Sequence, residues 1–428
     1  MSKRKLALNG GVPLITESFP RYNPIGREEL DAAHAVIESG RLSDFLGSWG
    51  PGFFGGEQVK AFEEAWASHF GVEHAVSMNS NTSGLVAALG AVGLSPGDEV
   101  IVSPWTMSAT ATAILVWNAI PVFADIEEET FNLGPASIER NVTEQTRAIL
   151  VTDIFGHPAE YDEIGRIAEK HGLAVIEDAA QAPGASYKGR PAGTLADIGV
   201  FSLNFHKHIH TGEGGVCVTN DLKLAERLQL IRNHGEAVVE AKGELDISNI
   251  IGFNFRLTEV QAAIGIEQLK KLDRIVAAKS LAATRLSDRL NHLGGLRTPI
   301  VKEDCIHSFY GYPFLVDDQV IGVPRDRIVE ALRAEGLLAA GGYCNLHLLP
   351  MYQQRIAYGT GGFPWTSECY QGNVSYDKGI CPVAERLHER DYMTVGWALY
   401  KNTDEQVDLT ADVFEKIWDH LDELRAPN

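Results

Sequence analysis

One lysine stands in a segment that could activate its amine. Lys207 lies in FSLNFHKHIHTGEGG (201–215), between His206 and His208 and shortly before a glycine-rich turn. Neighbouring cations and burial lower the pKa of a lysine and make its amine nucleophilic. Such an amine could form a Schiff base with an aldehyde cofactor, whereas a lysine standing alone would more often be a solvated loop residue.

Asp178 and the segment 79–83 offer two further groups. Asp178 follows the apolar run LAVIE (173–177), so we expect it at the carboxyl end of a buried strand, where open α/β sheets bind ligands. The polar run NSNTS (79–83) precedes a helical pattern, and the N–H groups of a helix N-terminus bind anions. Ordinary helix caps would use the same residues, so neither signal is specific alone.

Taken together, these groups match one cofactor. An aldehyde captured by Lys207, a pyridinium nitrogen held by Asp178 and a phosphate at Thr82, with Ser202 as a further hydroxyl, describe pyridoxal 5′-phosphate. The alternating histidines 206, 208 and 210 could share one face of a strand and bind a metal. No carboxylate ligand pattern accompanies them, so we expect no metal.

Strands alternating with helices must position these groups. Six apolar runs are expected strands: 99–103, 121–125, 147–152, 173–178, 198–203 and 215–219. Four amphipathic stretches are expected helices: 58–70, 82–93, 107–118 and 159–171. This order predicts a mainly parallel sheet covered by helices, and the closer spacing of the last strands favours one antiparallel strand.

The remainder of the chain predicts a smaller domain. A proline-free helical pattern over 257–290 would connect it to the large domain, and it would contain a strand near 309–316, a helix from Pro324 and a final helix over 409–424. Gly341 to Gly379 reads as a long loop. The expected division is 1–55 for an N-terminal segment reaching the site, 56–255 for the large α/β domain, 256–300 for the connecting helix and 301–428 for a small α+β domain.

Composition limits the partners. The 428 residues include 37 Lys and Arg against 57 Asp and Glu, a net charge of −20, which argues against nucleic acid and anionic membrane. Five scattered cysteines suggest neither a disulfide framework nor a zinc knuckle. The N-terminus lacks the apolar region of a signal peptide, and the most apolar stretch (109–124) is too polar for a membrane span, so we expect a cytoplasmic protein.

The motifs as a set resemble the DegT/StrS family of sugar aminotransferases, a branch of the fold type I pyridoxal phosphate enzymes similar to aspartate aminotransferase. The resemblance runs nearly end to end and rests on motifs in family order: LALNGG (6–11), ESGRLS (38–43), SPGDEVIVSPWTMSAT (95–110), IEDAAQAPGA (176–185), FSLNFHKHIHTGEGG (201–215) and GFNFRLTEVQAAIGIEQL (252–269).

The resemblance implies the role of each residue that matches a family position. Lys207 would bond to the cofactor and then move the substrate proton. Asp178 would pair with the pyridinium nitrogen, and Gln181 would lie beside the phenolic oxygen. Thr82 with its backbone neighbours and Ser202 would hold the phosphate.

The same resemblance implies a homodimer, because Asn254 matches an asparagine that reaches the phosphate from the partner subunit. Two positions depart from the family pattern. Asn81 replaces a usual glycine, and Asn tolerates left-handed backbone angles. Met107 stands where an aromatic residue usually stacks on the cofactor, with Trp105 two positions away. A branch with His in place of the lysine performs dehydration, so Lys207 favours transamination.

The implied function is transfer of an amino group from L-glutamate or L-glutamine to a keto sugar, with a nucleotide-linked keto-deoxysugar as the leading acceptor. A cyclitol ketone with glutamine as donor is the alternative, and a catalytically silent regulatory or sugar-binding relative is an alternative of another class. Arg232, His347 and Tyr352 are candidate substrate residues, with packing of the small domain as the other interpretation of the last two.

Overall fold

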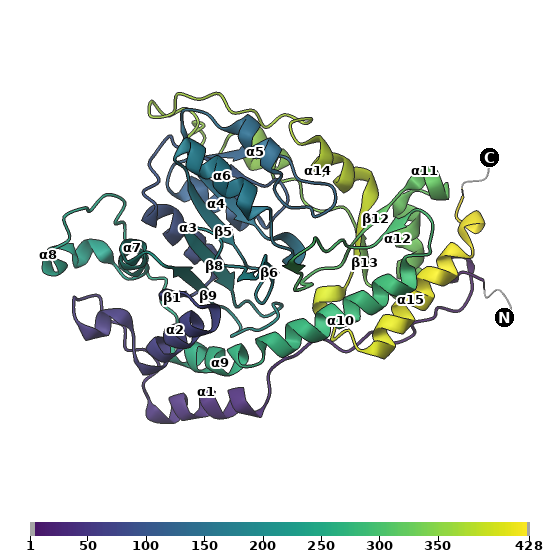
Figure 1. Ribbon diagram of the computed structural model, residues 1–428, viewed down its shortest axis with the longest axis horizontal. Coiled ribbons are helices and arrows are strands. Elements are labelled where there is room, and N and C mark those ends of the chain that lie inside the picture. Colours follow the sequence, from purple (N-terminus) through teal and green to yellow (C-terminus); the bar gives the residue numbers. More distant parts are fainter. Residues whose placement is uncertain (1–4, 426–428) are drawn as a thin grey trace.

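The computed structural model describes residues 5–425, and its centre is a seven-stranded sheet (Figure 1). Neighbouring strands pair in parallel, with one exception: β9 runs antiparallel to both of its neighbours, β8 and β1. The expected sheet with one reversed strand is therefore confirmed. In spatial order the strands are β1 (His74–Met78), β9 (Gly215–Thr219), β8 (Ile198–Ser202), β5 (Ala174–Asp178), β4 (Thr146–Thr152), β2 (Glu99–Val102) and β3 (Ile120–Phe123).

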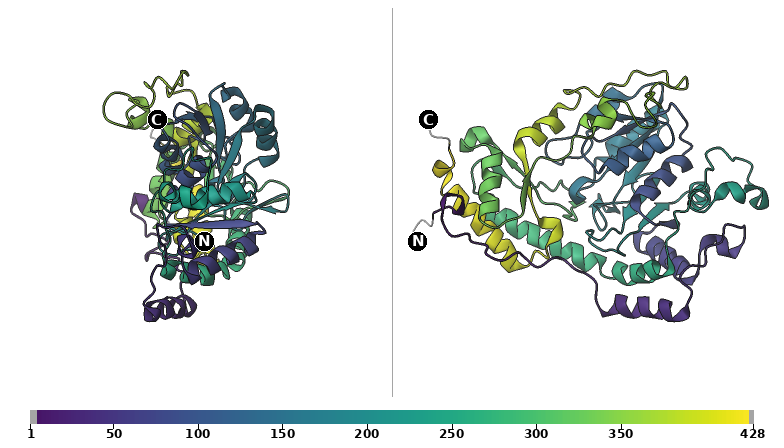
Figure 2. Two further views of the ribbon diagram at one scale, coloured as in Figure 1. Left: turned by 90° about the vertical axis from the view of Figure 1, so that its left-hand side faces the viewer. Right: turned by 180° about the vertical axis from the view of Figure 1, so that it is seen from behind.

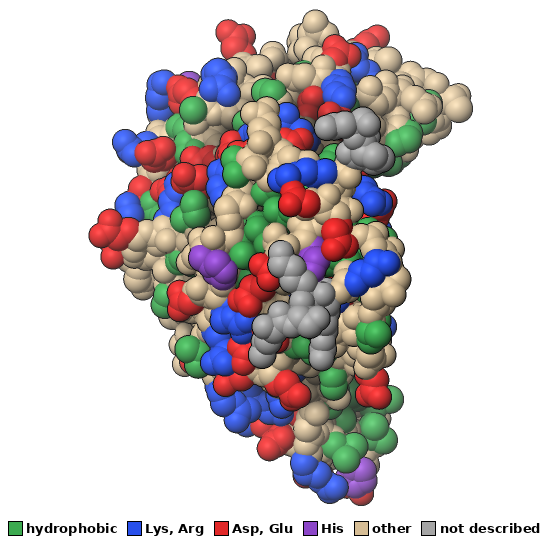
Figure 3. All heavy atoms as spheres, turned by 90° about the vertical axis from the view of Figure 1, so that its right-hand side faces the viewer, with side chains coloured by type: hydrophobic (Ala, Val, Ile, Leu, Met, Phe, Trp, Pro, Cys, Tyr) green, Lys and Arg blue, Asp and Glu red, His purple; other side chains and the backbone are tan. Residues whose placement is uncertain are grey.

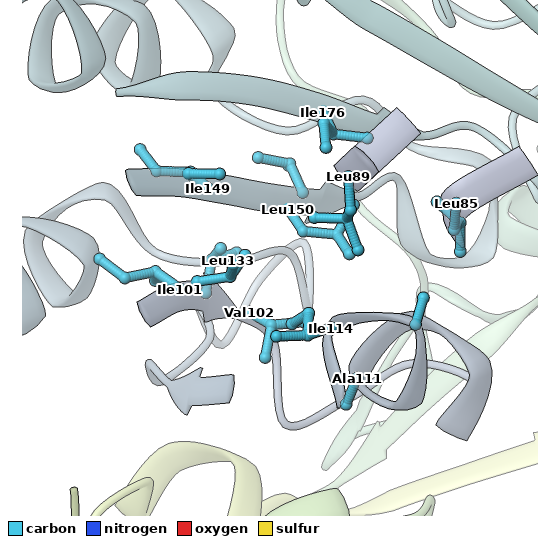
Figure 4. Close-up of a cluster of buried hydrophobic side chains, with 14 of the residues drawn as sticks. Leu85, Leu89, Ile101, Val102, Ala111, Ile114, Leu133, Ile149, Leu150 and Ile176 are labelled. Atoms are coloured by element: carbon cyan, nitrogen blue, oxygen red, sulfur yellow. The ribbon is translucent and has the colours of Figure 1, made fainter. Parts of the chain in front are cut away.

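Helices pack against this sheet through apolar side chains. Leu85 and Leu89 of α3 and Ile114 of α4 meet the strand residues Leu150 and Ile176 in the main core (Figure 4). Gly84 lets α3 approach the sheet, because a Cβ there would lie 2.5 Å from Val200 Cγ1. The helices of this domain are α2 (Glu57–Phe70), α3 (Asn81–Ala91), α4 (Ser108–Val116), α5 (Pro135–Asn141), α6 (Tyr161–His171) and α7 (Leu222–Arg232), with the short α8 (Val239–Lys242) away from the sheet.

The predicted single connecting helix is wrong in one respect. The chain forms α9 (Glu259–Leu269) and α10 (Leu272–Leu290), separated at Lys270 and Lys271. Lys271 Nζ donates to Glu29 and to the carbonyl of Pro24, which belong to the N-terminal segment. This contact joins distant parts of the chain and stabilises the interruption between the two helices. The local sequence pattern therefore does not predict it.

The second, smaller domain has an antiparallel sheet in the order β10 (Leu296–Arg297), β12 (Pro313–Val316), β14 (Tyr392–Val395) and β13 (Ala339–Gly341). Three short strands, β11 (Cys305–Ile306), β6 (Ser186–Tyr187) and β7 (Arg190–Pro191), form a separate sheet. The first and last described segments both lie at this domain, where Leu6 and Leu424 are part of its core (Figures 1 and 2). Its helices are α11 (Asp318–Ile321), α12 (Arg325–Ala334) and α15 (Asp404–Trp418), whereas α13 (Pro350–Gln353) and α14 (Pro382–Arg386) pack on the core of the large domain.

The N-terminal segment returns along the outside of the molecule to the large domain. Its helix α1 (Arg27–Ser39) packs on α9, and Tyr22 Oη donates to the carbonyl of His208 at 2.6 Å. Basic and acidic side chains are interspersed on the small-domain face (Figure 3). Within residues 5–425, the helices are all too short or too polar to traverse a bilayer.

Candidate active site

A cavity of about 330 Å³ lies where β5 and β8 end. The segments around it come from both strand ends, the starts of α3 and α4, and the small-domain side of the molecule, which contributes Tyr310 and Tyr343. Seven of the eight residues expected to bind the cofactor line it: Asn81, Thr82, Met107, Asp178, Gln181, Ser202 and Lys207. The sequence motifs therefore converge on one place.

Lys207 enters the cavity from the turn that follows β8. Its backbone N–H donates to the carbonyl of Asn204 at 2.9 Å, and its side chain is buried. Nζ lies 4.2 Å from the ring centroid of Tyr310. Burial lowers the pKa of Lys207 to about 8, although the charge of Asp178 opposes this shift. About a tenth of this amine is consequently uncharged and nucleophilic at pH 7, far more than for a solvated lysine.

Asp178 is the last residue of β5 and is buried within a set of donors. Its Oδ1 accepts hydrogen bonds from Asn81 Nδ2 and from the N–H of Ala180, both at 3.2 Å. Its Oδ2 accepts one from Thr110 Oγ1 at 2.9 Å. Burial raises the pKa of Asp178, whereas these donors and Lys207 lower it. The carboxylate is thus prepared to face a cation inside the cavity.

The N-terminus of α3 contributes Ser80, Asn81 and Thr82 to the cavity lining. Ser80 caps this helix by accepting from the N–H of Ser83, which leaves Thr82 in the first turn with its hydroxyl unbonded within residues 5–425. Asn81, which stands where the family usually has glycine, is the first residue of α3 and has a helical backbone, so its tolerance of left-handed angles is not used. Its side chain instead donates to Asp178 and to the carbonyl of Val200, contacts that a glycine could not make.

Met107 and Trp105 occupy different environments. Met107 precedes α4, lines the cavity and is 65% exposed. Trp105 is fully buried; its Nε1 donates to Asn345 at 2.7 Å, and its ring packs on Phe131, Tyr343 and Tyr392. Of the two, Met107 is therefore the side chain placed to contact a ligand.

Two tyrosines of the cavity were not anticipated from the sequence. Tyr310 faces Lys207, and Tyr343 packs on Phe155 with its ring centroid 5.6 Å away. Burial raises the pKa of Tyr343 to about 12, opposed by a hydrogen bond with Gln181. Gln181 in turn accepts from the N–H of Phe155 at 2.7 Å. Both tyrosines sit in irregular segments, where periodicity gives no signal.

The three alternating histidines have separate surroundings. His206 lines the cavity, and burial lowers its pKa to about 4. His208 is buried, with Nε2 2.8 Å from the carbonyl of Ser308, and His210 Nδ1 accepts from the N–H of Gly212. No group of three or more His, Cys, Asp or Glu side chains within residues 5–425 could hold a metal ion.

The three candidate substrate residues lie outside the cavity lining. Arg232 is fully buried against Glu63, with NH1 2.6 Å from its carboxylate, because β1 and α7 enclose this ion pair. His347 is also fully buried, with Nε2 2.9 Å from Glu385, and Tyr352 packs on Phe123. In the single chain the contacts of all three are structural, and their expected substrate role stays a prediction.

A second buried lysine, Lys279 of α10, lies outside the cavity. Its Nζ has no hydrogen-bond partner within residues 5–425 and lies 5.2 Å from the ring centroid of Tyr22. Burial lowers the pKa of Lys279 to about 8. Between that pH and about 10.4 the unfolded chain binds this proton more readily than the native chain, so stability should rise with pH across this window.

Replacing Lys279 with methionine is therefore expected to stabilise the apoprotein at pH 7 by about 1–3 kcal/mol. The gain should shrink above pH 8, where the native lysine loses its charge. Urea unfolding at fixed protein concentration, at pH 7 and pH 9.5, measures both effects. Lys270→Met, which changes an exposed lysine on the same side of the molecule, should shift stability by less than about 0.5 kcal/mol. A loss of stability in Lys279→Met at pH 7 would contradict the prediction.

Comparison with known proteins agrees with this site. The model of the DegT/DnrJ/EryC1/StrS aminotransferase family matches residues 38–395. The L-glutamine:2-deoxy-scyllo-inosose aminotransferase of Streptoalloteichus tenebrarius is 33% identical over 434 residues, covering 98% of this chain and 99% of that protein.

Two solved structures share the whole architecture. DesI, crystallised in the presence of its TDP-sugar product, is 28% identical with a TM-score of 0.80, covering 98% of this chain and 97% of its own. A GDP-4-keto-6-deoxymannose-3-dehydratase with a trapped PLP-glutamate geminal diamine is 25% identical with a TM-score of 0.75, covering 92% and 100%. The expected type I fold of the pyridoxal phosphate enzymes is thereby confirmed. The chain belongs to the DegT/DnrJ/EryC1/StrS aminotransferase family.

Proposed function

We propose that this aminotransferase uses pyridoxal 5′-phosphate to move an amino group from L-glutamate or L-glutamine to the ketone of a sugar. One observation carries the proposal: Lys207 and Asp178 line the same buried cavity, to which the N-terminus of α3 also contributes. A nucleotide-linked keto-deoxysugar is the leading acceptor class, supported by the TDP-sugar product in whose presence DesI was crystallised.

The chemistry of the cavity fits this cofactor. Lys207 supplies an amine whose Nζ makes no hydrogen bond within residues 5–425, and its lowered pKa suits reaction with an aldehyde. Asp178 supplies an anion for a ring cation. The first turn of α3, with the free hydroxyl of Thr82, and the hydroxyl of Ser202 supply phosphate ligands.

When bound, pyridoxal 5′-phosphate supplies an aldehyde that condenses with amines and a ring that accepts electrons from the adjacent carbon. Lys207 Nζ would take and return the substrate proton, for which a pKa of about 8 is well suited. Asp178 would hold a proton on the ring nitrogen through charge. Met107 and the tyrosines 310 and 343, which line the cavity, would contact the cofactor and limit the entry of water.

The visible spectrum of the protein loaded with pyridoxal phosphate tests this function. Adding the correct amino donor should abolish the visible band and leave bound pyridoxamine phosphate, whereas a protein that forms no visible band would contradict the proposal. Parallel additions of L-glutamate and L-glutamine identify the donor. Each candidate acceptor, a nucleotide-linked keto sugar or a cyclitol ketone, should then restore the band only if it is a substrate.

A cyclitol ketone is the second candidate acceptor. It is favoured by the inosose aminotransferase relative, which matches this chain over 98% of its length. In that case glutamine would be the donor. The two acceptors differ in charge, because only the sugar nucleotide brings a diphosphate.

We further propose a homodimer with shared sites. Asn254 is exposed and does not line the cavity of its own chain, as expected if it serves the partner's cavity. Two apolar side chains close to Lys207 are exposed in the single chain. Met107, which lines the same cavity, is 65% exposed, and Phe205, two residues before Lys207, is 58% exposed. No arginine lines the cavity within residues 5–425, and Arg256, which forms no ion pair there, is the candidate cation that a partner would bring to the donor carboxylate.

Asn254→Ala is expected to weaken pyridoxal phosphate binding about tenfold, because it removes a hydrogen bond to a charged group. Titration of the apoprotein measures the affinity, and Asn373→Ala, at an exposed asparagine outside the cavity, is the matched control.

Mixing the subunits tests the sharing directly. A heterodimer of Lys207→Ala and Asn254→Ala chains has one site with both changes and one with neither. At limiting cofactor the mixture should regain about a quarter of wild-type activity. If Asn254 served its own chain, each heterodimer site would carry one defect and mixing would restore nothing.

A further inference from the structure

A row of three threonine hydroxyls leads through the protein interior to Asp178. Thr152 Oγ1 donates to Thr106 Oγ1 at 3.1 Å, Thr106 Oγ1 lies 2.9 Å from Thr110 Oγ1, and Thr110 Oγ1 donates to Asp178 Oδ2 at 2.9 Å. All three threonines are buried, with at most 2% of their surface exposed. Thr106 and Thr110 reach the cavity lining, whereas Thr152 lies behind them.

The direction of this row follows from counting protons. An ionised carboxylate can only accept hydrogen bonds, so Thr110 must donate its single hydroxyl proton to Asp178. Thr106 must then donate to Thr110, and Thr152 to Thr106, as the geometry of that last contact shows independently. Every hydroxyl therefore points its proton toward the carboxylate. The order is complete only when Oδ2 is unprotonated.

Secondary structure fixes each member of the row. Thr152 is the last residue of β4 and pairs in register with Asp178, the last residue of β5. Thr106 follows β2, the other neighbour of β4, and Thr110 lies in the first turn of α4. Successive donors polarise one another, and a helix N-terminus favours a nearby anion. The sheet thus brings together three hydroxyls and a carboxylate that are up to 72 residues apart in the sequence.

We propose that Thr110, supported by Thr106 and Thr152, is a positioning residue that keeps Asp178 an ionised acceptor aimed at the ring nitrogen of the cofactor. The proposal rests on the proposed use of pyridoxal phosphate. Thr110 is the one donor to Oδ2 within residues 5–425, whereas Oδ1 has two. Its removal should weaken the pairing of Asp178 with the ring nitrogen and leave phosphate binding intact.

The test compares two ligands of the apoprotein: pyridoxal 5′-phosphate and its 1-deaza analogue, in which carbon replaces the ring nitrogen. Thr110→Val keeps the shape of the side chain and removes the hydroxyl. We expect it to weaken binding of pyridoxal phosphate about 10- to 100-fold, the usual effect of losing a hydrogen bond to a charged group. Binding of the analogue should change by less than about twofold, because it offers no nitrogen to Asp178.

Matched variants separate this role from packing. Thr112→Val changes the same residue type two positions along α4, where Oγ1 donates only to the carbonyl of Ala109, and should bind both ligands like the wild type. Thr110→Ser should restore most of the affinity. Thr106→Val and Thr152→Val should have progressively smaller effects, of about tenfold and about threefold, because they act through Thr110.

Equal losses for both ligands in Thr110→Val, or equal effects of Thr110→Val and Thr112→Val, would overturn the proposal and leave the proposed function standing. A wild-type apoprotein that binds neither ligand would overturn both. A loss confined to pyridoxal phosphate and reversed in Thr110→Ser would support both.

Discussion

Replacing Lys207 with alanine is expected to lower the rate of amino transfer by about 10³-fold or more. Lys207 is the one primary amine in the lining of the cavity, and no other lysine within residues 5–425 is placed to replace it. The purified variant, saturated with cofactor, should lose the visible band of the wild type and convert L-glutamate or L-glutamine at a background rate. Lys207→Arg should be equally inactive, because it keeps the charge and loses the nucleophile.

The same prediction has a pH dependence. Only the uncharged amine reacts with an aldehyde, and burial lowers the pKa of Lys207 to about 8. The rate at which the apoprotein captures pyridoxal phosphate should therefore rise with pH and level off above about 8, instead of rising to about 10.4 as for a solvated lysine. Stopped-flow absorbance measures this rate. Retained turnover in Lys207→Ala, or a rate that still climbs tenfold between pH 9 and pH 10, would contradict the assignment.

The sequence identifies the part of the site that follows from strand ends. Asp178 and Ser202 are each the last residue of a strand whose apolar run is unmistakable, and parallel strands must bring such ends to one edge. Lys207 could be predicted because it lies in a turn rich in histidine and glycine. The fold was predictable because fully buried strands appear as short continuous apolar runs, whereas amphipathic helices are longer and show the 3.6-residue period.

Other parts of the site could not be predicted because they depend on contacts between distant segments. Thr106 lies just after an expected strand and Thr110 lies within an expected helix, where a threonine is an ordinary residue, and only the folded sheet brings them next to Asp178. Arg232 carries the opposite lesson. A cation near a family motif suggests an anionic substrate, but Arg232 is fully buried and its partner Glu63 is 169 residues away in the chain.

Replacing Asp178 with asparagine is the most demanding test of the site, because the two side chains are nearly isosteric. Asp178→Asn keeps the volume and a carbonyl oxygen that can accept from Thr110, but it removes the charge. We expect amino transfer to fall by about 10³-fold, since a neutral amide cannot keep a buried ring nitrogen protonated. Cofactor affinity should fall as well, by about tenfold or more.

An additional ligand distinguishes lost charge from lost structure. N-methylated pyridoxal phosphate carries a permanent positive charge on the ring nitrogen, so it does not need Asp178 to hold a proton there. With this ligand the rate of Asp178→Asn should be at least about tenfold higher than with pyridoxal phosphate, and Lys207→Ala should stay inactive. Asp162→Asn, at an exposed carboxylate paired with Lys188 and Arg190, is the control and should retain wild-type rates. If Asp178→Asn stayed within tenfold of wild type, the ring nitrogen would not depend on this carboxylate, and the arrangement of donors around it would need another explanation.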